Sequence, residues 1–171
     1  MPVEPPVKRA LAFIDGQNLF RDVRKVFSYN YPNYDVQKLS EAVCVARGWR
    51  LDRVHFYTGV PSQSDNAFWH GFWANKLAVM GRRGVAVYSP PAGLPQQDDP
   101  SCRFRPVQLL SGEEKGIDVR LALDVLDAAH QMKFDVALIF SQDQDLSELA
   151  SLIRQFAKFQ DRCVLVNSNM G

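Results

Sequence analysis

The chain has 171 residues, 46% of them hydrophobic and 23% charged, which suits one globular domain and excludes a largely disordered chain. Twenty Lys and Arg residues against nineteen Asp and Glu residues leave a net charge of +1. This balance excludes nucleic-acid binding that is driven by overall positive charge, although a local basic patch remains compatible with it.

The cysteines and the apolar runs indicate the compartment. Cys44, Cys102 and Cys163 are an odd number without CxxC spacing, which argues against a disulfide framework and against a zinc site. The longest early apolar run, residues 10–14, is too short for a signal peptide or a membrane span. We therefore predict a cytoplasmic protein with no membrane partner.

Proline placement divides the chain. Three of the ten prolines fall in the first six residues, and five fall between positions 90 and 106. Proline lacks the backbone N–H that strands and helix interiors require. Residues 1–8 are therefore predicted to be a loose leader, and residues 9–171 a single domain with a long Pro-rich loop at 90–106.

Short apolar runs alternate with segments of helical periodicity. The predicted elements in chain order are a strand at 10–14, helices at 19–27 and 36–46, a strand at 53–58, a helix at 65–80, a strand at 84–88, a helix at 117–129, a strand at 136–140, a helix at 146–159 and a strand at 163–166. Strands that are apolar on both faces and separated by helices indicate an α/β domain, with a mostly parallel sheet of about five strands covered on both sides. Ligands of such sheets bind beyond the carboxyl ends of the strands, where the strand order reverses.

Acidic residues gather at the predicted strand ends. Asp15 follows the first strand directly, and Asp143 and Asp145 follow the strand that ends at position 140. If these strands are neighbours, Asp15 and Asp143 point into one crevice, and Asp118 can enter it from the start of its helix. Asp124 lies six residues after Asp118 and points about 120° away from it around that helix.

Structural roles are the alternative for these residues. Asp15 or Asn18 can simply cap the first helix, and Ser141 and Gln144 have the spacing of a capping box. Against this, several carboxylates at one sheet edge repel one another unless a cation neutralises them, and oxygen ligands suit Mg²⁺ or Mn²⁺. Such ions activate water for phosphodiester hydrolysis. Asn18 can orient a water or a phosphate oxygen. Lys115 can supply positive charge to the phosphate, with pairing to the neighbouring Glu113 and Glu114 as the alternative.

Four blocks of the sequence resemble a known family. They are FIDGQNL at 13–19, RVHFYTG at 53–59, KGIDVRLALD at 115–124 and FSQDQDL at 140–146. In this order they resemble successive blocks of the NYN domain, the PIN-like family that includes the LabA-like (DUF88) bacterial proteins. The resemblance spans nearly the whole chain.

The resemblance implies a PIN-like, Rossmann-like three-layer α/β/α sandwich and a metal-dependent ribonuclease, an endonuclease rather than an exonuclease, with RNA as partner and Mg²⁺ or Mn²⁺ as cofactor. At the matching positions it implies metal-binding acids, further catalytic residues and supporting residues. The metal-binding acids are Asp15, Asp118 and Asp143. The further catalytic residues are Asn18 and Asp145. Asp124 is a supporting residue, and the position of Lys115 makes it a second one.

Two other functions remain open. The family usually has Gly at the position of Gln142 and often a small residue at Gln144, so two glutamines narrow the crevice or add amide contacts. A catalytically weak RNA-binding module is therefore one alternative. A phosphatase for small phosphoesters is another, although Gln17 interrupts the DxD pattern that an aspartyl-phosphate mechanism needs.

Basic and aromatic groups supply further candidates. Arg21 and Arg24 follow the Asp15 loop, and Arg103 and Arg105 lie on the long loop. We predict that these four hold RNA, with solvated surface positions as the alternative.

The helix at 65–80 carries Phe68, Trp69, Phe72 and Trp73. Core packing is favoured for this stripe. The alternatives are a homodimer surface, with Trp69 or Trp73 at the interface, and stacking on unpaired bases.

Overall fold

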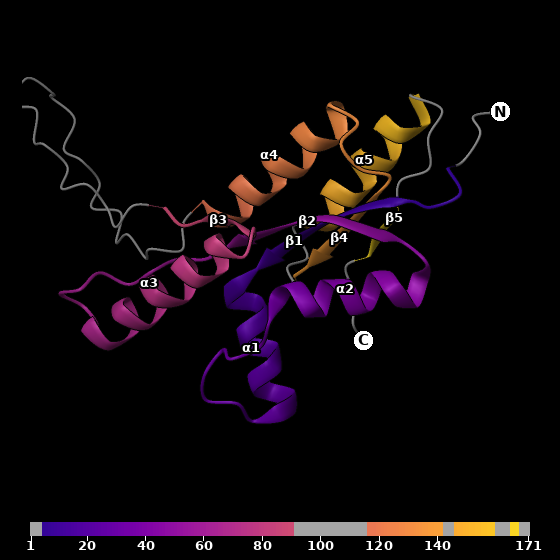
Figure 1. Ribbon diagram of the computed structural model, residues 1–171. Helices are drawn as coiled ribbons and strands as arrows, with labels where there is room; N and C mark the ends of the chain where they lie inside the picture. Colours follow the sequence, from indigo (N-terminus) through magenta and orange to yellow (C-terminus); the bar gives the residue numbers. More distant parts are fainter. Residues whose placement is uncertain (1–4, 91–115, 142–145, 160–164, 168–171) are drawn as a thin grey trace, which may run out of the picture.

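Figure 1 shows the computed structural model of the chain, which describes residues 5–90, 116–141, 146–159 and 165–167. Within these residues one sheet of five strands has the order β3-β2-β1-β4-β5. The strands are β1 (Arg9–Asp15), β2 (Arg50–Tyr57), β3 (Ala86–Tyr88), β4 (Val136–Phe140) and β5 (Leu165–Asn167). All neighbouring strands run parallel, which confirms the predicted sheet.

Helices cover both faces of this sheet (Figure 1). They are α1 (Gly16–Phe27), α2 (Val36–Arg47), α3 (Ala67–Arg82), α4 (Ile117–His130) and α5 (Leu146–Phe159). The predicted helices are confirmed, with one early start. Helix α1 begins three residues before its apolar pattern does, because Asp15 caps it and its first turn carries polar side chains.

Two hydrophobic cores form the contacts between the layers. Along β1, Ala12 and Ile14 belong to the core that includes residues of α1, α2 and α3, whereas Leu11 and Phe13 belong to the core with α4 and α5. This alternation follows from the strand, whose successive side chains point to opposite faces. It places Asp15 on the face of the sheet that α4 and α5 cover.

The aromatic stripe of α3 is divided between core and surface. Trp73 is buried against Phe56, which confirms the favoured core position for this residue and excludes the alternative interface position. Trp69 and Phe72 are half-buried, and Phe68 is exposed. Core packing therefore accounts for only part of this stripe. None of the helices within the described residues is long and apolar enough to cross a membrane.

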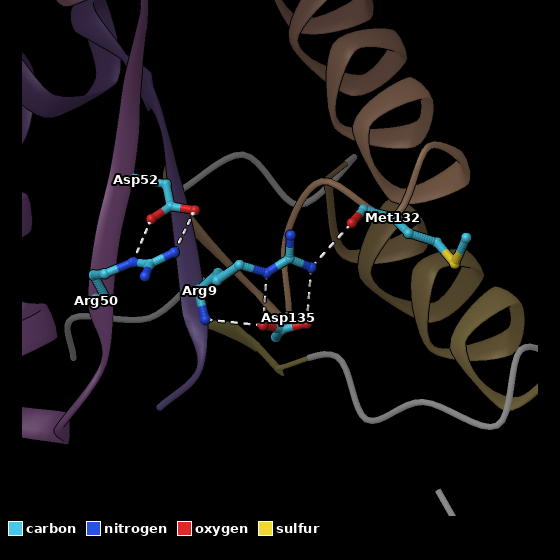
Figure 2. Close-up of polar contacts among 5 residues, drawn as sticks. All are labelled: Arg9, Arg50, Asp52, Met132 and Asp135. Atoms are coloured by element: carbon cyan, nitrogen blue, oxygen red, sulfur yellow. Dashed lines mark hydrogen bonds and ion pairs between the residues drawn. The ribbon is translucent and has the colours of Figure 1, made fainter. Parts of the chain in front are cut away.

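An ion pair fastens the amino ends of β1 and β4. Figure 2 shows Arg9 against Asp135: Nε donates to Oδ2 at 3.1 Å, Nη2 to Oδ1 at 3.3 Å, and the backbone N–H of Arg9 to Oδ2 at 2.9 Å. The guanidinium also donates to the carbonyl of Met132 at 3.0 Å. The side chain of Asp135 is buried, so a bidentate partner compensates for the loss of its hydration.

We expect Asp135→Asn to lower the free energy of unfolding by about 1–3 kcal/mol, because charge-assisted hydrogen bonds at a buried carboxylate are lost. Urea denaturation measures this change. Asp52→Asn is the matched control, since Asp52 pairs with Arg50 in the exposed contact of Figure 2 and is expected to contribute less than about 1 kcal/mol. Equal losses in both variants would contradict the assignment.

His55 of β2 makes the stability depend on pH. Its ring stacks on Phe13 with centroids 5.0 Å apart, and burial, followed by the charge of Arg53, lowers the pKa of His55. A folded-state pKa below the unfolded value of about 6.5 gives stability that is present above that pH and lost as the pH falls below it. The melting temperature of His55→Gln is therefore expected to fall less than that of the unchanged protein between about pH 7 and pH 5. Parallel curves would refute this expectation.

Candidate active site

The strand order reverses between β1 and β4, because the chain extends the sheet through β2 and β3 on one side of β1 and through β4 and β5 on the other. Ile14 and Phe140 are paired across these two strands. The carboxyl ends of β1 and β4 are therefore neighbours, which is the condition under which Asp15 and Asp143 were predicted to share one crevice. Such a reversal is the usual ligand-binding position of an α/β sheet.

Asp15 lies at this position and is only 3% exposed. Its Oδ1 accepts the backbone N–H groups of Gln17 at 3.0 Å and Asn18 at 3.1 Å, so Asp15, rather than Asn18, caps α1. Its Oδ2 accepts the side-chain amide of Asn18 at 2.6 Å. The same amide nitrogen donates to the hydroxyl of Ser141 at 3.0 Å. Asn18 therefore links the carboxyl end of β1 to that of β4.

Asp118 approaches Asp15 from the first turn of α4. The two carboxyl groups are within hydrogen-bonding distance of each other. Burial raises the pKa of Asp15, while hydrogen bonds from Asn18, Asp118 and Gln17 oppose this rise. Gly116, which precedes α4, has φ +95°, a left-handed conformation that favours glycine. The structure thus brings together three of the predicted residues, Asp15, Asn18 and Asp118.

Asp124 is placed differently, about 9 Å further along α4 than Asp118. Its Oδ2 accepts the hydroxyl of Tyr57 at 3.0 Å, and its Oδ1 pairs with Arg120 at 3.0 Å. Burial and the charge of Asp124 raise the pKa of Tyr57, so the phenol stays protonated as the donor. Since Tyr57 is paired with Asp15 across β1 and β2, Asp124 joins α4 to the strand beside the candidate site.

The remaining predicted residues divide into two sets. Arg21 and Arg24 are exposed on α1, which starts at the site. Those that lie outside the described residues are Asp143, Asp145, Lys115, Arg103, Arg105, Gln142 and Gln144.

Two residues at the site were not among the predicted ones. The sequence predicts Ser141 only as part of a capping box, although its place directly after β4 signals a position at the same edge as Asp15. Tyr34 donates its hydroxyl to the carbonyl of Gly16 at 3.4 Å, and burial, followed by the charge of Asp15, raises the pKa of Tyr34. Tyr34 belongs to a turn, where hydrophobic periodicity gives no signal.

The chemistry of the described donors fits a divalent cation. No three acidic, histidine or cysteine side chains within the described part of the chain are grouped as metal ligands, and the third predicted acid lies outside it. The carboxyl groups of Asp15 and Asp118 nevertheless lie next to each other, and their oxygens are hard metal ligands. Two carboxylates at this distance need a proton or a cation between them, and oxygen donors of this kind suit Mg²⁺ or Mn²⁺.

The sequence model of the NYN domain family matches residues 9–160. A search of curated proteins found no matching relative. The fold is similar to the crystal structure of a protein of unknown function from Vibrio parahaemolyticus, with 18% sequence identity and a TM-score of 0.56. That similarity covers 96% of this chain and 83% of the other, and it concerns the fold alone.

Proposed function

The chain belongs to the NYN domain family, which has a PIN-like nuclease fold, and on this basis we propose that it is a metal-dependent ribonuclease that cuts RNA internally. The observation that supports this proposal most is the approach of Asp118 to the buried Asp15 at the point where the strand order reverses. A carboxylate pair in that position is suited to metal-assisted hydrolysis of a phosphodiester.

In this proposal Asp15, Asp118 and Asp143 hold Mg²⁺ or Mn²⁺, which when bound supplies an activated water and positive charge for the scissile phosphate. Asn18 acts as a positioning residue, because its backbone and side-chain N–H groups fix both oxygens of Asp15. Asp124 supports the site through Tyr57. Further proposed roles are catalytic for Asp145, charge supply for Lys115, and RNA binding for Arg21, Arg24, Arg103 and Arg105.

The compartment and the domain boundaries are further parts of the proposal. Cys44 is a free, buried thiol, and burial raises its pKa, which keeps it protonated and unreactive. This agrees with a reducing, cytoplasmic setting. We also propose the leader at 1–8 and the single domain at 9–171; residues 91–106 of the predicted Pro-rich loop lie outside the described residues.

The test uses labelled single-stranded and hairpin RNA with Mn²⁺, Mg²⁺ or EDTA, and the Asp143→Asn variant beside the unchanged chain. Internal cuts that need the metal and disappear in Asp143→Asn are expected. Release of single nucleotides from one end would replace the endonuclease by an exonuclease. RNA binding without any cut would reject the nuclease in favour of the binding module, and hydrolysis of a chromogenic phosphoester alone would favour the phosphatase.

A further inference from the structure

Exposed aromatic rings form two pairs, one at the end of α1 and one between the turn that follows and α3. Within the described residues, every aromatic ring among the exposed large hydrophobic side chains belongs to Phe27, Tyr29, Tyr31 or Phe68, each 45–60% exposed. Phe27 and Tyr29 stack with centroids 5.7 Å apart, and Tyr31 meets Phe68 at 6.2 Å. We call these four residues the aromatic surface. It spans the end of α1, the turn that follows and the start of α3.

Half-buried rings hold the Tyr31–Phe68 part of this surface in place. Tyr31 also packs on Trp69 at 5.9 Å and on Phe72 at 6.1 Å, and Trp69 in turn meets Phe20 of α1 at 6.2 Å. The turn after α1 is therefore fixed to α3. Since rings that are already ordered lose little conformational entropy on binding, the surface is prepared for a flat ligand.

Helix α1 supplies positive charge beside the aromatic surface. Helix α1 carries the exposed Arg21, Arg24 and Lys25 against a single acid, Asp22. The turn at 28–34 contains no charged residue, and α3 contains no acid. The acids that border these segments are Asp35, which pairs with Arg83, and Asp65. An apolar protein partner has no need of this charge, whereas the phosphates of a nucleic acid complement it.

Helix α1 connects the aromatic surface to the candidate active site. Its first residue, Gly16, follows Asp15 directly, and its last residue is Phe27. Twelve residues of α-helix span about 18 Å. That length corresponds to roughly five nucleotides at the stacked spacing of about 3.4 Å.

We propose that the aromatic surface binds unpaired RNA nucleotides by stacking, while Arg21, Arg24 and Lys25 contact their phosphates, so that a single strand is led along α1 to Asp15. The inference rests on the proposed function for its ligand class. Stacking selects single strands, because the bases of a duplex already cover one another's faces.

Binding is measured without cleavage by fluorescence anisotropy in EDTA, with a labelled single strand of about ten nucleotides and a duplex of the same sequence. Phe27→Ala and Phe68→Ala are each expected to weaken single-strand binding at least about fivefold, with little effect on the duplex. Leu152→Ala, which removes an exposed aliphatic side chain from α5, is the matched control and is expected to bind like the unchanged chain. Circular dichroism checks that the variants are folded.

Several results would overturn the inference. The first is the absence of RNA binding by the unchanged chain. The second is an affinity of the ring variants for the single strand that equals that of the unchanged chain. The third is an equal loss of affinity for the single strand and for the duplex in the ring variants. A dimer in sedimentation that the ring variants dissociate, with RNA affinity unchanged, would identify the surface as a protein interface instead. If RNA binding depends on the rings but no cleavage occurs, the nuclease proposal is rejected and this inference stands. If the chain cleaves RNA but binding does not depend on the rings, the nuclease proposal stands and this inference is rejected.

Discussion

Asp15→Asn is expected to reduce RNA cleavage at least about 100-fold, since even outer-sphere partners of a catalytic metal contribute about 10- to 100-fold. An amide oxygen can still accept the N–H groups of Gln17 and Asn18, so α1 keeps its cap. The amide nitrogen then replaces Oδ2, the acceptor of the Asn18 side-chain amide, and the negative charge beside Asp118 is lost. The loss should therefore lie in cleavage and leave the fold intact.

Initial cleavage rates in Mn²⁺ measure this effect, and thermal melting with and without Mn²⁺ provides an independent readout. The metal is expected to raise the melting temperature of the unchanged chain and not that of Asp15→Asn, because a ligand stabilises only the state that binds it. Asp124→Asn is the matched control: it weakens contacts to Tyr57 and Arg120 and is expected to retain most of the metal response. Full activity in Asp15→Asn would refute the assignment.

Gly16→Ala is expected to destabilise the protein by about 1–3 kcal/mol, the usual range for overpacking a filled core. A Cβ atom on Gly16 would overlap with Cζ of Phe56 and lie 3.0 Å from the carbonyl oxygen of Tyr57. Phe56 is fully buried against Trp73, so its ring cannot move aside cheaply. The start of α1 must shift instead, and the capping contacts of Asp15 shift with it.

Urea denaturation measures the expected loss, and Gly71→Ala is the control of opposite sign. Gly71 lies inside α3, where an added Cβ meets no atom within 4 Å. Alanine is there expected to raise stability by up to about 1 kcal/mol, because it favours the helix over the unfolded chain. If both variants changed stability equally, close packing would not explain the glycine after Asp15.

Local pattern was sufficient to predict the elements, but it did not determine their contacts. The apolar run of β1, followed directly by Asp15, indicated both the strand and the edge of the site. The approach of Asp118 depends on α4 lying over the sheet face that carries Asp15, which no local spacing specifies. The contact of Arg9 with Asp135 joins residues 126 apart and was missed for the same reason.

The aromatic stripe of α3 shows the same limit. Spacing showed that Phe68, Trp69, Phe72 and Trp73 lie close together on the helix, and it favoured a core position for all of them. Which ring is buried depends on the partner elements, since Trp73 meets Phe56 of β2 while Phe68 extends to Tyr31 beyond α1. Exposure was therefore a property of the fold and not of the pattern.

Strands β1 and β4 are fastened at both ends, by Arg9 with Asp135 at one edge and by Asn18 with Ser141 at the other. A shift of one residue in the register of β1 against β4 would break both the ion pair and the hydrogen bond, and it would turn Asp15 to the opposite face, away from Asp118. The acids therefore keep their alignment for as long as the sheet centre stays intact. In native-state hydrogen exchange, the central amides of β1 and β4 should open only together with global unfolding, so thermal fluctuations short of unfolding leave the site assembled.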